Sequence, residues 1–123
     1  MLQIIPLADG TEVYRIDKIM YGSAKEVARL LLNDAGPCYR FIKECPSSDT
    51  RYFFVQETMK ILGEDFRELV INSKDIPLRN FAQSGLIFLQ AIVDLFYDPK
   101  SIELMDNVER WYDNMDHRAK ELQ

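Results

Sequence analysis

The segment from Leu78 to Tyr97 is apolar on almost every side, and this constrains the fold more than any other feature of the chain. At ~100° per residue, its main polar side chains fall on one narrow stripe of a helix. That stripe consists of Arg79, Gln83, Gln90 and Asp94. Such a pattern is typical of a helix surrounded by other elements. The sequence therefore predicts a packed helical domain with 78–97 in the middle and with Leu89, Ile92 and Phe96 buried.

Composition limits the class of protein. The chain has 123 residues, of which 47% are hydrophobic, so we expect one domain, 1–123, with a core of its own. A net charge of −5 disfavours nonspecific attraction to phosphate backbones or anionic lipid surfaces. The longest nearly apolar run, residues 85–97, is shorter than the ~20 residues that a membrane-spanning helix needs. The N-terminus lacks the basic start of a secretory signal, so we expect a cytoplasmic protein without a membrane partner.

The N-terminal residues predict a β-hairpin. Two β-rich runs, Leu2–Leu7 and Thr11–Ile16, flank Ala8-Asp9-Gly10, where glycine supplies the positive φ of a tight turn. Pro6 has no N–H for a ladder hydrogen bond, which places the first strand at an edge. A lone hairpin is marginal in water, so it must lie on the helices or extend another sheet.

Helix signals divide the rest of the chain. Ser23 and Glu26 have the spacing of a capping box and begin a helix that we expect to end at Asn33–Gly36. Pro37 then suits the first turn of a short second helix, Cys38–Glu44. A third helix follows the loop 46–49. Its apolar residues recur every three or four positions, and Gly63 is its expected weak point. The apolar residues are Tyr52, Val55, Met59, Leu62, Phe66 and Leu69.

The last two helices should pack as an antiparallel pair. Asp98-Pro99 is a short corner, with Asp98 placed to cap and Pro99 in the first turn of the last helix. That helix has a seam of about two and a half heptads: Met105, Val108, Tyr112, Met115, Ala119 and Leu122. A seam this short favours packing within the chain, although it leaves a homodimer open. The fold class is therefore mostly α (α+β), with an N-terminal β-hairpin followed by a compact bundle of about five helices.

No residue pattern points to catalysis. Cys38 and Cys45 are too far apart on a helix to bridge, and we read them as reduced, buried residues. Glu109, Asp113 and His117 share one helical face, but such an acidic row is ordinarily solvated surface. We therefore expect no enzyme activity, no catalytic residues, no cofactor and no metal site.

Nucleic-acid binding is the alternative from another class. Residues 25–29, Lys-Glu-Val-Ala-Arg, are similar to the opening of many helix-turn-helix units. The second half departs from that motif, because Gly36-Pro37 would fall inside the recognition helix. A transcriptional regulator would have to use a scattered basic patch despite the net acidity, so nucleic acid is a disfavoured partner. That patch consists of Lys18, Lys25, Arg29, Arg40 and Lys43.

The favoured function is protein binding. Phe53-Phe54 and Trp111-Tyr112 are consecutive aromatic pairs, so one member of each pair must leave the helical seam that the other joins. Displaced aromatic residues are typical interface anchors. Ile4 and Ile5, in the edge strand, offer strand pairing as a second mode. We expect another protein as the partner, with the chain acting as an inhibitor, an immunity or antitoxin-type protein, a chaperone or a complex subunit.

Overall fold

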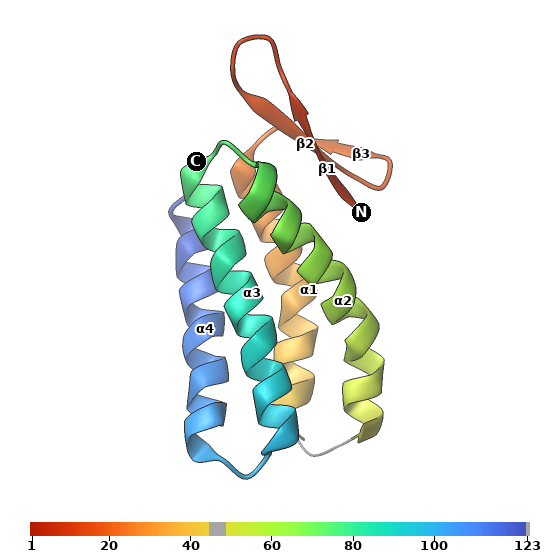
Figure 1. Cartoon of the computed structure of the whole chain (residues 1–123), viewed down its shortest axis with the longest axis vertical. Helices are drawn as coiled ribbons and strands as arrows, with labels where there is room; N and C mark the ends of the chain where they lie inside the picture. Colours follow the sequence, from red (N-terminus) through yellow and green to blue (C-terminus); the bar gives the residue numbers. More distant parts are fainter. Residues whose placement is uncertain (45–48, 123) are drawn as a thin grey trace.

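The residues that the structure describes form a bundle of four helices with a small antiparallel sheet at one end (Figure 1). The computed structural model describes residues 1–44 and 49–122. The strands are β1 (Leu2–Pro6), β2 (Glu12–Ile16) and β3 (Ile19–Tyr21), and the helices are α1 (Ala24–Glu44), α2 (Asp49–Asn72), α3 (Ile76–Tyr97) and α4 (Ile102–Lys120). The α+β class is confirmed. The prediction of about five helices is wrong within the described residues, which form four.

The surplus predicted helix arises at Gly36-Pro37, which does not end a helix. α1 runs through both residues as one helix of 21 residues. Pro37 lacks an N–H and should cost ~3 kcal/mol or more inside a helix. Its ring is exposed, whereas Cys38 and Ile42 beyond it are fully buried and extend the apolar face of the first half. Burial of that continuous face outweighs the local signal. It also removes the turn on which a helix-turn-helix reading depended.

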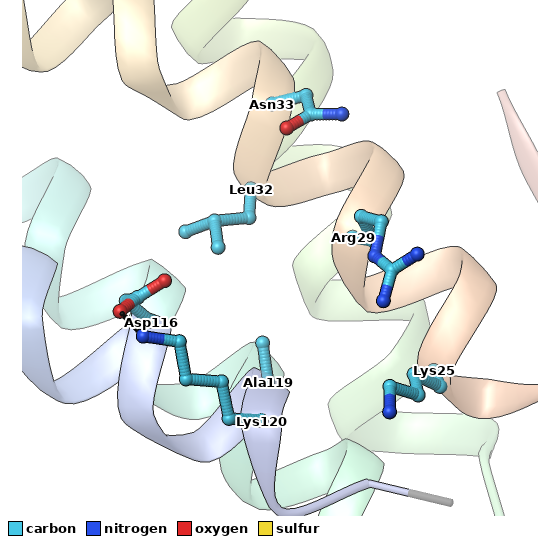
Figure 2. Close-up of a pocket in the computed structure, with 7 residues that line it drawn as sticks. All are labelled: Lys25, Arg29, Leu32, Asn33, Asp116, Ala119 and Lys120. Atoms are coloured by element: carbon cyan, nitrogen blue, oxygen red, sulfur yellow. Dashed lines mark ion pairs between the residues drawn. The ribbon is translucent and has the colours of Figure 1, made fainter.

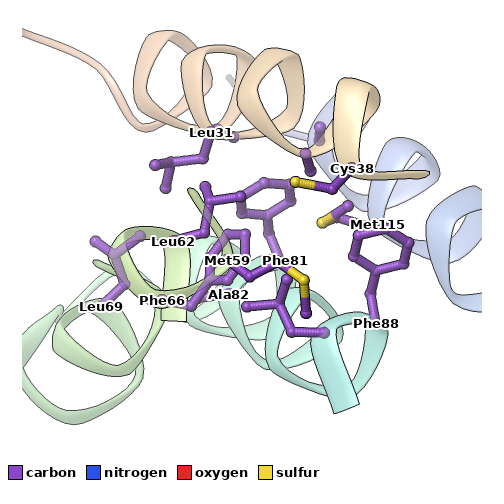
Figure 3. Packing of buried hydrophobic residues seen from close by; sticks show 14 of the residues in the cluster. Leu31, Cys38, Met59, Leu62, Phe66, Leu69, Phe81, Ala82, Phe88 and Met115 are labelled. Carbon is purple, nitrogen blue, oxygen red and sulfur yellow. The ribbon is translucent and has the colours of Figure 1, made fainter. Parts of the chain in front are cut away.

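α3 lies at the centre of the bundle, as its composition predicts. It packs against α1, α2 and α4, and the stripe residues Arg79, Gln83, Gln90 and Asp94 are all exposed. Leu89 and Ile92 are buried as expected, while Phe96 is only partly buried. Figure 3 shows the core, to which all four helices contribute. Its largest fully buried helical side chains include Leu31, Phe66, Phe81, Phe88 and Met115.

The α3–α4 corner makes the predicted antiparallel pair with different capping residues. Asp98 ends α3, and its N–H donates to the carbonyls of Asp94 and Leu95. α4 begins after Ser101, whose Oγ accepts from the N–H of Leu104 at 3.2 Å. The N-cap is therefore Ser101 and not Asp98, because its hydroxyl lies at the first turn.

The sheet has one strand more than the predicted hairpin. Gly10, with φ of +89°, makes the expected first turn, and β1 lies at the edge. The second turn contains Asp17 with φ of 56°, a conformation that Asp adopts more readily than most residues. It returns the chain as β3, so that the order is β1-β2-β3.

Asp65 of α2 fixes β1 to the bundle. The N–H of Leu2 donates to Asp65 Oδ1 at 2.9 Å, and both residues are buried. Burial raises the pKa of the Asp65 carboxyl, although the Leu2 N–H and the terminal amino group favour its charged form. The hydrogen bond therefore satisfies the buried N–H of Leu2 at the cost of desolvating the Asp65 carboxyl.

Glu12 of β2 fixes the sheet to the α2–α3 connection. Its Oε1 accepts from Ser73 Oγ at 3.1 Å and from the N–H groups of Lys74 and Asp75 at 2.6 and 3.2 Å. Tyr14 is buried beside this carboxyl, and burial together with the nearby acidic charges raises its pKa to about 12. The second strand is thus held at the start of α3.

Two glycines of the helices differ in what surrounds them. A Cβ on Gly85 would lie 2.6 Å from the ring of Phe66, which is fully buried. A Cβ on Gly63 would meet only Leu89 Cδ1, at an ordinary 3.7 Å. Gly85 is therefore required by packing of α3 against α2, whereas Gly63 is not. The sequence indicates Gly63 as the weak point of its helix, but α2 runs through this residue without a break.

We predict opposite stability changes for alanine at these two positions. Gly85→Ala should lower the free energy of unfolding by about 1–3 kcal/mol, because Phe66 cannot move without disturbing the core. Gly63→Ala should raise it by about 0.5–1 kcal/mol, because alanine is the better helix former. Urea unfolding of both variants measures this difference. A stabilised Gly85→Ala variant would contradict the packing described here.

Asp65 provides a second test. Asp65→Ala leaves the Leu2 N–H without an acceptor and should cost about 1–3 kcal/mol, whereas Asp65→Asn keeps an acceptor oxygen and should cost less. Because the folded-state pKa is raised, Asp65 favours folding most when protonated, and that contribution is lost as pH rises through the raised pKa. The stability of Asp65→Asn relative to the native chain should therefore fall as pH is lowered from 7 toward 4. A relative stability that increases on acidification is the opposite result.

Candidate protein-interaction surface

The start of α2, the end of α3 and the start of α4 lie at the end of the bundle opposite the sheet, here called the distal end (Figure 1). Phe53 lies in the second turn of α2, Tyr97 ends α3 and Ile102 begins α4. Their exposed fractions are 74%, 80% and 78%. No other described large apolar residue is as exposed, apart from Met1. Strongly exposed apolar side chains on three helices at one end of the bundle make that end a candidate interaction surface.

A stacked aromatic pair supports this end from within. Tyr52 of α2 stacks on Phe96 of α3 with ring centroids 3.9 Å apart and an interplanar angle of 24°. Phe96 in turn contacts Tyr97 edge to face at 5.5 Å. Phe96 is partly buried, and Tyr52 covers one face of its ring. The exposed Tyr97 is thereby joined to a fixed aromatic group.

The predicted interface residues of α4 lie elsewhere. Trp111 and Tyr112 are both partly buried and pack against the core. Tyr112 stacks on Tyr39 of α1 at 4.3 Å with nearly parallel rings, and both rings contact Phe88 of α3. In the isolated chain, the stacking of Tyr112 on Tyr39 therefore contributes to packing between α4 and α1.

The remaining predicted interface residues are separated. Phe53 is strongly exposed at the distal end, and the side chain of Phe54 lies outside what the structure describes. Ile4 packs partly against the core from the inner face of the sheet. Ile5 is partly exposed on the outer face, opposite Val13. The structure therefore does not bring the predicted set together as one site.

The free edge of β1 is poorly suited to strand addition. Leu7 donates its N–H across the hairpin, so odd-numbered residues of this strand face β2 and even-numbered residues direct their backbone groups outward. Of the outward N–H groups, that of Leu2 is bonded to Asp65 and Pro6 has none. Only Ile4 retains an outward donor. At the other edge, β3 is three residues long.

A groove between α1 and α4 carries an excess of positive charge. It has a volume of about 380 Å³ and a floor that includes Leu32 and Ala119. Figure 2 shows Lys25 and Arg29 on one wall and the ion pair of Asp116 with Lys120, at 3.0 Å, on the other. Lys25 and Arg29 have no ion-pair partner within the described residues.

A second groove lies between α2 and α3. Its volume is about 300 Å³, and Gly63 forms part of its surface. The apolar lining residues are Tyr52, Met59, Leu86, Leu89 and Val93, and the polar ones are Gln56, Lys60, Arg67 and Gln90. Because Tyr52 also stacks on Phe96, this groove meets the distal end at one of its ends.

The reactive side chains have environments that suit structure more than chemistry. Cys38 is buried, and burial together with Asp34 raises its thiol pKa to about 11. His117 is exposed, with Nε2 3.2 Å from Glu121 Oε1, and it makes no such contact to Asp113 or Glu109. The described residues contain no cluster of three His, Cys, Asp or Glu able to hold a metal. Cys45 lies outside the described residues. Among the described helices, none combines the length and apolarity of a membrane span.

Comparison with known proteins gives no assignment. The chain matches no protein-family model, no curated protein and no solved structure.

Proposed function

We propose that this protein acts by binding another protein, and that the distal end is the contact surface. The supporting observation is that Phe53, Tyr97 and Ile102 are each strongly exposed at this end, where Tyr52 stacks on Phe96. Apolar and aromatic side chains that lose contact with water on association are typical of binding hot spots. The partner should contribute an apolar surface that covers these three residues.

The distal end has two advantages over the surfaces predicted from sequence. Phe53 and Tyr97 are already exposed, so association with them needs no rearrangement of the core, whereas Trp111 is partly buried against it. The side chains of the distal end are also held by helix ends, and Tyr97 contacts Phe96, which lowers the entropy lost on binding. The edge of β1, where only Ile4 has a free outward backbone N–H, offers neither property.

The surroundings of Cys38 and His117 favour a binding function over catalysis. A thiol with a pKa of about 11 is protonated at neutral pH and is a weak nucleophile. His117 is an exposed residue of the last turns of α4 and is paired with Glu121. Neither residue has the dry, polarised surroundings that general acid-base catalysis requires.

Nucleic-acid binding is less well supported than protein binding. The continuous α1 helix places Lys25, Arg29, Arg40 and Lys43 toward one side. However, Lys43 Nζ is 2.9 Å from Glu109 Oε1, and Arg40 lies near the Tyr112 hydroxyl. A phosphate backbone would have to displace the Glu109 contact and approach the acidic residues of α4. This would weaken the electrostatic attraction on which such binding depends.

The test compares two pairs of surface substitutions. Tyr97→Ser with Ile102→Ser removes apolar area from the distal end. Ile71→Ser with Ile76→Ser removes similarly exposed side chains, 66% and 64%, at the sheet end of α2 and α3. Both pairs should leave the melting temperature nearly unchanged, because all four side chains are largely solvated in the folded chain. Affinity purification from the native host with the native chain and both variants provides the comparison.

We expect a partner protein that is retained by the native chain and by the Ile71/Ile76 variant and is lost by the Tyr97/Ile102 variant. The loss should correspond to about 2 kcal/mol or more of binding free energy. Equal retention by all three chains would contradict the proposal. Sedimentation velocity of the purified chain is the second measurement. A dimer that the native chain forms and the Tyr97/Ile102 variant does not would show that the partner at the distal end is a second copy of this chain.

A further inference from the structure

Gly63 occupies a helix interior without a structural reason. Glycine is less favourable than alanine inside a helix, and most helical glycines are retained for a turn or a close contact. The φ of Gly63 is negative, and a Cβ at this position would meet only Leu89 Cδ1 at 3.7 Å. Gly85, by contrast, is required by the Phe66 ring. The absence of a side chain at Gly63 therefore leaves space at the surface and not in the core.

That space belongs to the groove between α2 and α3. Met59 and Leu89 form the more buried part of its lining, and Leu86 and Val93 are partly exposed beside them. A missing side chain over an apolar floor allows another backbone or a bulky side chain to approach closely. The shape suits an inserted apolar side chain between two helices, the usual arrangement when an amphipathic helix binds in a groove.

The charged residues that line the groove indicate which kind of ligand it favours. Lys60 and Arg67 lie on the α2 side, seven residues and therefore about 10.5 Å apart along the helix. Both are exposed and have no ion-pair partner within the described residues. The opposite side presents the neutral Gln90. A ligand with acidic residues about two turns apart would pair with both cations.

The groove and the distal end form a continuous surface. Tyr52 lines the groove and stacks on Phe96, which contacts the exposed Tyr97. From Tyr52 to Arg67 the groove follows α2 for about 22 Å, the length of a helix of about 15 residues. A partner anchored at the distal end can therefore extend one helix along this groove.

We propose that the groove between α2 and α3 binds an acidic amphipathic helix of the partner protein, with an apolar residue over Gly63 and carboxylates beside Lys60 and Arg67. This inference rests on the proposed function, because it describes how the same partner extends from the distal end. Asp94 lies toward that end, so the acidic residues of the occupant face the Lys60–Arg67 part of the groove.

The experiment uses a synthetic helical peptide of about 15 residues as the probe. It is built from Leu, Ala and Glu, with Leu on one face and Glu flanking it; a second peptide has Lys in place of Glu. Each is titrated into the isotope-labelled full chain and followed by amide chemical shifts. We expect the acidic peptide to shift residues 56–67 and 86–93 and to bind more weakly as salt is raised. The basic peptide should leave these signals unchanged.

Four variants separate the groove from other causes. Gly63→Leu fills the space, and Lys60→Glu with Arg67→Glu reverses the charges. Each should weaken binding of the acidic peptide by about tenfold or more. Lys25→Glu with Arg29→Glu reverses as many charges in the groove between α1 and α4 and should have no effect. Gly63→Ala should raise the melting temperature and also weaken binding of the acidic peptide. A purely structural role for this position would not weaken that binding.

The results distinguish this inference from the proposed function. Shifts that map to Lys25 and Arg29, equal binding of both peptides, or no shift in the native chain would overturn the groove assignment. None of these outcomes changes the affinity comparison at Tyr97 and Ile102. Conversely, if the distal-end substitutions retain every partner while the acidic peptide still binds between α2 and α3, the groove stands and the distal end does not.

Discussion

Close packing of Phe66 against Gly85 is the contact on which the arrangement of α2 and α3 depends. The Phe66 ring occupies the space in which a Cβ on Gly85 would lie, and it also meets Phe81 edge to face at 5.9 Å. This contact brings the two helices together near the sheet end. α3 also packs against α1 and α4, so its buried side chains face three helices, while the stripe with Arg79, Gln83, Gln90 and Asp94 stays exposed.

The same helix pair creates both candidate surfaces. One turn from the Phe66 contact, Gly63 faces the groove and not the core, so the helices carry a hollow beside their closest packing. At the distal end, Tyr52 and Phe96 close the pair by stacking and leave Tyr97 beyond them. The sheet, held by Asp65 and Glu12, covers the opposite end. The sheet thus lies at one end of the bundle, and the most exposed apolar side chains of the described helices belong to the other end.

Sequence patterns predicted the elements better than their boundaries. The apolar surface of 78–97 was sufficient to predict a central helix, because few other folds bury so many directions of one element. Pro37 was misleading because its local preference for a helix start is overridden by burial of Cys38 and Ile42. β3 was not predicted, because its turn uses Asp17 and no glycine marks the positive φ.

The candidate site was predicted only in part. Phe53 and Phe54 are both predicted interface residues, because one member of the pair must leave the seam, and Phe53 is exposed. Tyr97 and Ile102 were not predicted, since each belongs to an apolar pattern and only the position of the helix ends leaves it uncovered. Trp111 leaves its seam as expected, yet a neighbouring surface covers part of it. Single-helix periodicity gives the direction of a side chain and not what lies there.

The central claim is that a partner protein covers the α2–α3 side and the distal end of this chain. Site-specific photocrosslinking tests it most directly, with a benzophenone amino acid in place of Gln90 in one chain and of Asn33 in another. Gln90 lines the groove between α2 and α3, whereas Asn33 lines the one between α1 and α4, and both side chains are exposed. The account predicts that the captured partner crosslinks from position 90 and not from position 33. Crosslinking from position 33 alone would contradict it.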